Sequence, residues 1–251
     1  MNLDLNGKVA LVTGGARDVG GDISKLLAEE GAKVAVNYNS SAEEAEKVAS
    51  TIVDAGGEAK AFRADISDYD QVNQMVDGVI SEWGRVDILV NNAGYVKYQR
   101  FVESGPEDWK PQIDVCLYGA LHCCRAVAPH MIEQGGGRII SLIGDSSRIG
   151  EANLALAAAT RAGTMALGKS LAKELGRSGV TVNTVSLGLV QTSHSDAGFL
   201  EKNMEKIVKA YPLRRIGQAD DVAPMVAFLA SDQAAWITGQ VISVNGGFCM
   251  V

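Results

Sequence analysis

The stretch Thr13-Gly14-Gly15-Ala16-Arg17-Asp18-Val19-Gly20 decides the fold. An apolar run at 8–13 precedes it, and an amphipathic stretch at 19–30 follows it. A glycine-rich turn between a buried strand and a helix is typical of doubly wound α/β folds, because glycine allows a tight turn and close packing of the helix on the strand. The turn alone is a weak signal, so the prediction depends on the rest of the chain.

The rest of the chain alternates short apolar runs with longer amphipathic stretches. Strands are expected at 8–13, 33–38, 58–63, 86–91, 137–143, 180–185 and 240–244. Helices are expected at 19–30, 42–55, 69–83, 107–133, 152–177 and 220–230. This order predicts right-handed crossovers and a parallel sheet covered by helices on both faces. No linker, repeat or low-complexity tract interrupts it, so residues 1–251 are expected to form one domain.

Helix ends are marked by capping residues. Gly31, Gly56 and Gly84 follow three expected helices as C-caps, and Ser41 and Asp68 precede two as N-caps. The polar segment 191–210 does not fit the alternation. An excursion of this length in a compact domain often forms a lid over a ligand, so we expect a lid there.

Composition excludes some partners and favours one compartment. The net charge is −7, and nucleic acids and anionic membranes require a basic face, so we expect neither as a partner. The first residues lack the basic and apolar segments of an export signal, and no apolar run is long enough to span a bilayer. The four cysteines have neither metal-site nor disulfide-framework spacing. We expect a soluble cytoplasmic protein with free, packed cysteines and no metal.

Five motifs in order along the chain resemble those of the short-chain dehydrogenase/reductase superfamily. They are the turn at 13–20, Asp65, Asn91-Asn92-Ala93-Gly94, the segment 212–217, and the segment from Thr238-Gly239-Gln240 to Gly246-Gly247. Together they cover nearly the whole chain. The resemblance implies a seven-stranded Rossmann-type sheet. It also implies subunit contacts through the helices at 107–133 and 152–177, with a second contact at the last strand.

The catalytic positions that the resemblance implies are vacant in this chain. Members of the superfamily use a tyrosine as acid/base, a lysine four residues later, a serine that orients the substrate oxygen, and an asparagine that positions a water. These roles fall on Ala157, Arg161, Gly144 and Cys116. Alanine and glycine have no side-chain proton to exchange, and arginine is not a base near neutral pH. The resemblance therefore predicts a chain with no catalytic residues of its own.

The nucleotide-binding positions are degenerate. Gly14 and Gly20 are kept in the turn, but Asp18 replaces the glycine that approaches the pyrophosphate. A carboxylate about 4 Å from a phosphate costs roughly 4 kcal/mol at an effective dielectric constant near 20. Alternatively, Asp18 caps the first helix. Nothing at 37–40 can recognise a ribose 2′-substituent, and Leu187-Gly188 replaces the usual Pro-Gly. The remaining candidates, Asp65, Asn91 and Gly94, lie at strand ends where they also have structural roles.

A few other side chains are candidates to replace the missing catalytic groups. Tyr95 and His194 are candidates for a relocated acid or base, and Tyr98 lies close to the first. Asp145, Ser146 and Ser147 form a polar cluster without a base to activate it. For His122 and His130 a packed or interface position is expected, and for Trp83, Trp109 and Trp236 a place in the core or at an interface.

These observations lead to one hypothesis and one alternative. The hypothesis is a non-catalytic subunit of a hetero-oligomeric NAD-dependent dehydrogenase, paired with an active homologue or with itself through helices 107–133 and 152–177, with no cofactor in this chain and NAD in the partner. The chain resembles the inactive partner of one such pair, the two-subunit hydroxyacyl-CoA dehydrogenase of anaerobic toluene (benzylsuccinate) degradation. The alternative is an NAD(P)-dependent oxidoreductase of the 3-hydroxyacyl/3-oxoacyl type, or a nucleotide-free lyase, with relocated catalytic residues.

Overall fold

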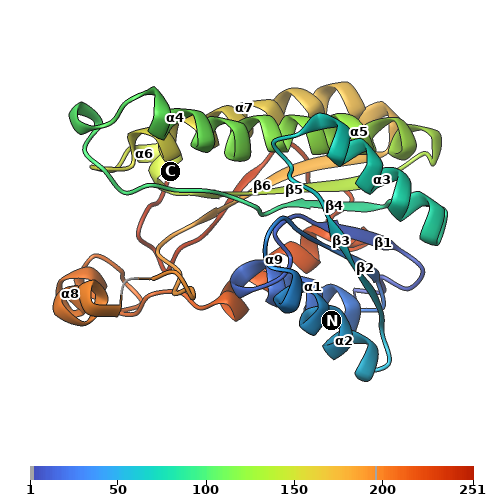
Figure 1. Cartoon of the computed structure of the whole chain (residues 1–251), viewed down its shortest axis with the longest axis horizontal. Coiled ribbons are helices and arrows are strands. Elements are labelled where there is room, and N and C mark those ends of the chain that lie inside the picture. The colour runs from blue at the N-terminus through green and yellow to red at the C-terminus, as the bar shows by residue number, and fades with distance from the viewer. Residues whose placement is uncertain (1–2, 196) are drawn as a thin grey trace.

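The computed structural model describes residues 3–195 and 197–251, and its centre is one parallel sheet (Figure 1). The strand order is β3-β2-β1-β4-β5-β6-β7. The strands are β1 (Val9–Val12), β2 (Lys33–Tyr38), β3 (Glu58–Arg63), β4 (Ile88–Asn91), β5 (Gly137–Gly144), β6 (Val180–Leu187) and β7 (Val241–Val244). The expected strands are all present, which confirms the predicted Rossmann-type doubly wound sheet.

Helices cover both faces of this sheet. They are α1 (Asp18–Glu29), α2 (Ala42–Asp54), α3 (Tyr69–Trp83), α4 (Pro106–Ile113), α5 (Gly119–Glu133), α6 (Ser146–Ile149), α7 (Ala155–Leu175), α8 (Ala197–Lys209) and α9 (Ala219–Ala230). One face carries α1, α2 and α9, and the other carries α3, α4, α5 and α7 (Figure 1). A separate apolar cluster fills the space under each layer. The order of the strands reverses between β1 and β4, where ligands bind in folds of this kind.

The expected helix at 107–133 is interrupted. The five residues Asp114–Tyr118 (η2) form a π-type turn between α4 and α5, closed by a hydrogen bond from the N–H of Gly119 to the carbonyl of Asp114. The carbonyl of Cys116 in this turn accepts a hydrogen bond from the hydroxyl of Thr164 on α7, at 2.9 Å. Hydrophobic spacing does not distinguish such a turn from a continuous helix, which is why the prediction was wrong here.

One further helix prediction needs correction, and the segment expected to form a lid holds a helix whose role as a lid stays a prediction. The stretch expected at 152–177 becomes helical only at α7, because Asn153 adopts a left-handed backbone (φ 68°) and Leu154 is the N-cap; the short 3₁₀ turn Gly176–Ser178 (η3) follows α7. The segment 191–210, expected as a polar lid, contains the amphipathic helix α8. Residue 196 of that segment lies outside the described residues.

The predicted caps are confirmed in part. The carboxylate of Asp68 accepts two backbone hydrogen bonds from the first turn of α3, and Gly84 ends that helix in the left-handed region at φ 78°. Gly31 and Gly56 also have positive φ, one residue beyond the C-caps of α1 and α2. Ser41 occupies the N-cap position of α2, but its side chain makes no capping hydrogen bond.

The packed side chains agree with most expectations. Cys116, Cys123, Cys124 and Cys249 are free and buried, and burial raises the pKa of Cys124 to about 11. The Nδ1 atom of His122 lies 2.9 Å from the carbonyl of Ile66, as expected of a packed histidine.

The three tryptophans differ in their surroundings. Trp83 packs against Phe62 with ring centroids 6.0 Å apart, and Trp109 stacks on Phe101 at 5.8 Å. Trp236 is 99% exposed, so a place in the core of this subunit is wrong, and a place at an interface stays a prediction. In the described part of the chain we find neither a metal-ligand cluster nor a helix long and apolar enough to span a membrane.

Candidate active site at the carboxyl edge of the sheet

The glycine-rich turn at 13–20 packs as the motif predicts. Gly14 has a φ of 59°, and a side chain at Gly20 would place its Cβ 2.2 Å from the carbonyl oxygen of Gly14. Both positions therefore require glycine. Two asparagine side chains form hydrogen bonds with the backbone of the turn. The amide oxygen of Asn37 accepts from the N–H of Gly14 at 3.2 Å, and Nδ2 of Asn92 donates to the carbonyls of Thr13 and Gly14 at 3.0 and 3.1 Å.

Asp18 occupies the one position in this turn where the resemblance expects glycine, and it has a positive φ of 50°. The N-cap of α1 is Arg17, so the alternative in which Asp18 caps the helix is wrong. Instead, its carboxylate accepts from the backbone N–H of Ser193 at 2.7 Å and from the hydroxyl of Ser193 at 2.8 Å. The turn is thereby tied to the segment before α8, and a carboxylate occupies the position where the resemblance implies a glycine beside a pyrophosphate.

The vacant catalytic positions cluster around the end of β5 and the start of α7. Gly144 ends β5, and a Cβ there would meet only the hydroxyl oxygen of Ser146, at 3.4 Å. Ala157 is buried in the first turn of α7. Cys116 is buried in the π-type turn, with its thiol donating to the carbonyl of Tyr95 at 3.3 Å. These positions lie at the same edge of the sheet, and none of them carries the tyrosine, lysine, serine or asparagine that the resemblance expects.

Arg161 is the one charged side chain among these positions. Its Nη1 donates to the carbonyl of Leu142 at 2.5 Å, and its Nη2 donates to the carbonyl of Ala93 at 3.4 Å. A side chain at Gly94 would collide with this guanidinium. Within the described part of the chain no carboxylate lies at ion-pair distance from Arg161. The guanidinium therefore joins the ends of β4 and β5 and retains unused N–H groups.

Asp145, next to the vacant serine position, has a structural environment. It is buried, with its carboxylate accepting from the hydroxyl of Ser186 at 2.5 Å and from Nδ2 of Asn245 at 2.6 Å. Burial, together with the charge of Asp145, raises the pKa of Glu151. The hydroxyl of Ser147 is buried without a hydrogen-bond partner among the described residues. Among the described residues no histidine or lysine forms a hydrogen bond or ion pair with this cluster, and its lack of an activating base stays a prediction.

The candidate substitutes for the missing acid or base lie at the surface. Tyr95 is 46% exposed and Tyr98 is 64% exposed. The contact between Tyr95 and Cys116 uses backbone atoms of the tyrosine rather than its hydroxyl. His194 is exposed in the turn that begins at Ser193. Their catalytic role remains a prediction.

The remaining nucleotide-site candidates have structural partners. The carboxylate of Asp65 accepts from the N–H and hydroxyl of Ser67 at 2.9 and 2.6 Å. Nδ2 of Asn91 lies 3.3 Å from the hydroxyl oxygen of Ser141, and Gly94 covers Arg161. The contacts that sequence reasoning missed, Asp18 with Ser193 and Asp145 with Asn245, join residues 175 and 100 positions apart, so no local signal points to them.

Comparisons with known proteins agree with this fold. A family model described as Enoyl-(Acyl carrier protein) reductase matches residues 14–249. The chain is 42% identical to the 3-oxoacyl-[acyl-carrier-protein] reductase FabG of Staphylococcus aureus over 97% of its own length and 98% of that protein. It is 40% identical to an uncharacterized oxidoreductase of Methylorubrum extorquens, over 97% and 98% of the two lengths. A crystal structure of a putative short-chain alcohol dehydrogenase from Sinorhizobium meliloti superposes with a TM-score of 0.94 at 30% identity, covering 99% of this chain and 98% of that one.

Proposed function

The chain belongs to the short-chain dehydrogenase/reductase superfamily, and we propose that within it this chain is a non-catalytic subunit of a hetero-oligomeric NAD-dependent alcohol or hydroxyacyl-CoA dehydrogenase. The observation behind the proposal is the absence of a proton donor or base where the superfamily keeps one: Gly144 and Ala157 present no exchangeable proton, and the cation of Arg161 is bonded to two carbonyls. A positioned acid/base contributes about 10²–10⁴-fold to such a reaction, and residues that act together lose most of it together.

One side chain at the phosphate turn, that of Asp18, opposes a dinucleotide. The carboxylate of Asp18 lies at the turn, held by Ser193, and the side chain of Asn37 is buried beneath it rather than directed at a ribose. A negative group at this position opposes a pyrophosphate. The proposal therefore assigns NAD to an active partner subunit and no cofactor to this chain.

The proposed partner is a homologous active subunit, a second copy of this chain, or both, docked through helices 107–133 and 152–177. Leu117, Leu121, Leu156, Met165 and Leu167 on these helices are half-buried in the isolated chain, so they retain apolar surface for a contact. Ala120 and Ala126 on the first of these helices are buried and offer no such surface. Within this proposal, the two-subunit enzyme of benzylsuccinate degradation remains the candidate complex, supported by the resemblance alone.

The second candidate is an NAD(P)-dependent oxidoreductase of the 3-hydroxyacyl/3-oxoacyl type. The named relatives favour this candidate more strongly than the first, since the Staphylococcus protein is a 3-oxoacyl-[acyl-carrier-protein] reductase. This candidate requires that Tyr95 or His194 act as a relocated acid or base. It also requires that the nucleotide bind despite the carboxylate of Asp18. The two candidates thus differ in whether the isolated chain reduces a ketone.

The test is an activity measurement on the purified chain with acetoacetyl-CoA and with NADH or NADPH. With either nucleotide, the expected turnover is no higher than the background measured in the same preparation from host cells that lack the gene. Turnover that disappears in Tyr95→Phe or His194→Ala would establish the second candidate. Purification of the native complex and identification of its subunits tests the partner: a homologue with an intact Tyr-x-x-x-Lys pair is expected, and a chain that purifies only as a monomer contradicts the subunit proposal.

A further inference from the structure

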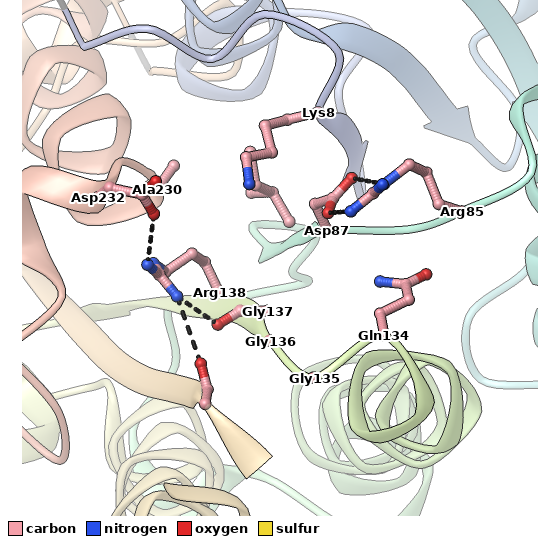
Figure 2. A pocket seen from close by; sticks show the side chains of 12 residues that line it. Lys8, Arg85, Asp87, Gln134, Gly135, Gly136, Gly137, Arg138, Ala230 and Asp232 are labelled. Carbon is pink, nitrogen blue, oxygen red and sulfur yellow. Dashed lines mark hydrogen bonds and ion pairs between the residues drawn. The ribbon is translucent and has the colours of Figure 1, made fainter.

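A second polar pocket lies at the opposite edge of the sheet from the candidate active site. It has a volume of about 250 Å³ and is lined by residues at the amino ends of β1, β4 and β5 and by the start of the 3₁₀ turn Asp232–Ala234 (η4) (Figure 2). This volume is slightly below the usual range of small-molecule sites, so an occupant would be small. Nothing in the proposed function uses this pocket.

The first charged pair in the pocket is complete. Nε and Nη2 of Arg85 donate to the two carboxylate oxygens of Asp87 at 2.7 and 2.6 Å. One of these oxygens also accepts from the N–H of Val9 at 2.9 Å. The carboxylate is nearly buried, with 6% of the side chain exposed, and this bonding raises the pKa of Arg85. Asp87 is therefore satisfied without a further cation, whereas Nη1 of Arg85 has no partner in the described part of the chain.

The second charged pair places another guanidinium on the opposite wall. Nη2 of Arg138 donates to the carboxylate of Asp232 at 2.8 Å, and Nη1 donates to the carbonyl of Gly137 at 3.0 Å. The side chain of Arg138 is 13% exposed, whereas that of Asp232 is 79% exposed. Water screens the charge of Asp232 far more than that of Arg138. The pair consequently leaves positive potential on the pocket side.

Lys8 is the cation without a partner. Its Nζ points into the space between Arg138 and Asp87 (Figure 2), and no carboxylate among the described residues lies within ion-pair distance of it. Three cations thus line the pocket against two carboxylates, which leaves one positive charge in excess. Lysine is a common phosphate ligand, and its ammonium can donate three hydrogen bonds.

A glycine run keeps the pocket open on its remaining side. A Cβ at Gly135 would meet nothing within 4 Å, and one at Gly136 would meet only the carbonyl oxygen of Gly179, at 3.7 Å. The N–H groups of these glycines cap α5 by bonding the carbonyls of Ile132 and Met131 at 3.1 and 3.0 Å. The capped helix end presents fewer free carbonyls, and so opposes an anion less than an uncapped end would.

The geometry points to a phosphate-binding site in this pocket, formed by Lys8 with Arg85 and Arg138, for inorganic phosphate or a small phosphate ester. A tetrahedral oxyanion has acceptors directed toward several walls at once, whereas a carboxylate has two oxygens in one plane. The excess positive charge and the unused N–H groups of Lys8 and Arg85 supply what such an anion needs. The pocket lies apart from the candidate active site at the other edge of the sheet, so this proposal can be tested separately from the proposed function.

Calorimetric titration of the full chain with sodium phosphate at pH 7.5 and constant ionic strength tests the site. We expect one site with a dissociation constant on the order of 1 mM, and at least tenfold weaker binding of acetate. Lys8→Gln is expected to weaken phosphate binding about tenfold or more, because one charge-assisted contact is lost. Lys47→Gln on the exposed surface of α2 removes the same net charge and is expected to change the affinity less than twofold.

Two further measurements keep the proposal testable if Lys8→Gln fails to fold. Gly136→Asp introduces a carboxylate into the open wall at a position without positive φ, and is expected to abolish phosphate binding. Competition by glycerol 3-phosphate would assign the site to phosphate esters, and its absence would restrict it to inorganic phosphate. Equal affinity for phosphate in the wild type, Lys8→Gln and Gly136→Asp would overturn the site, and equal affinity for acetate would overturn its preference for phosphate.

Discussion

The phosphate turn at 13–20 and the corner formed by the end of β5 and the start of α7 lie at the same edge of the sheet, but they depart from the superfamily pattern in different ways. The turn keeps the glycines that its packing requires and gains one carboxylate, Asp18, bonded to Ser193. The corner loses side chains instead, at Gly144 and Ala157, and its charged groups bond to backbone and neighbouring side chains. A single substitution could therefore reverse the change at the turn, whereas the corner would need several.

The largest expected effect tests the turn. Asp18→Gly removes the carboxylate that faces a pyrophosphate and relaxes a residue held at φ 50°. We expect affinity for NAD(H) or NADP(H) to rise by up to about a thousandfold, from a repulsion of roughly 4 kcal/mol. Calorimetry measures it. The control is Ser193→Ala, which removes the hydroxyl bond to the carboxylate but keeps the backbone N–H bond and the charge, and should not improve binding. If the wild type bound NAD(H) or NADP(H) with a low-micromolar dissociation constant, Asp18 would not be an obstacle to nucleotide binding.

The second expected effect is a loss of stability at the corner. Asp145→Ala leaves the buried hydroxyl of Ser186 without its acceptor, and the amide of Asn245 keeps only the carbonyl of Cys249, so we expect the free energy of unfolding to fall by about 3 kcal/mol. Urea denaturation measures this. The matched control, Asp232→Ala, removes a carboxylate that is 79% exposed and should cost within about 0.5 kcal/mol. Equal losses in the two variants would mean that Asp145 is not a structural anchor.

The sequence predicts the sheet and most helices because their signals are local: buried Val and Ile runs and helical spacing need no information from distant residues. The sequence does not predict the π-type turn at 114–118, because this turn changes the hydrogen-bond register of the helix without changing its hydrophobic spacing. Helix α8 was not predicted, because the polar residues of the segment 191–210 outweigh the short amphipathic pattern within it. At the site, motif positions predict which residues gather, but not what Asp18 and Asp145 bond to, since those partners come from the far end of the chain.

The third prediction concerns the two backbone hydrogen bonds that Arg161 donates at the corner. Arg161→Ala removes the donors to the carbonyls of Leu142 and Ala93, and we expect a loss of about 1–2 kcal/mol in the free energy of unfolding. Arg161→Lys keeps the charge but can reach the two carbonyls less well, so about half of that loss is expected. If Arg161→Ala were as stable as the wild type, the guanidinium would be held for a ligand rather than for the fold.

The smallest effect on folding is expected outside both regions, at Trp236. Its side chain is 99% exposed in the subunit, so Trp236→Ala should change the free energy of unfolding by less than about 0.5 kcal/mol at concentrations where the chain is monomeric. An exposed tryptophan of this size is costly unless something covers it, and tryptophan is enriched among the residues that dominate subunit contacts. We therefore expect the same substitution to weaken self-association or binding to the homologous subunit about tenfold or more, as measured by light scattering across a dilution series. Unchanged association would place the contact elsewhere and leave helices 107–133 and 152–177 as the remaining candidates, so this variant separates the assembly surface from the altered edge of the sheet.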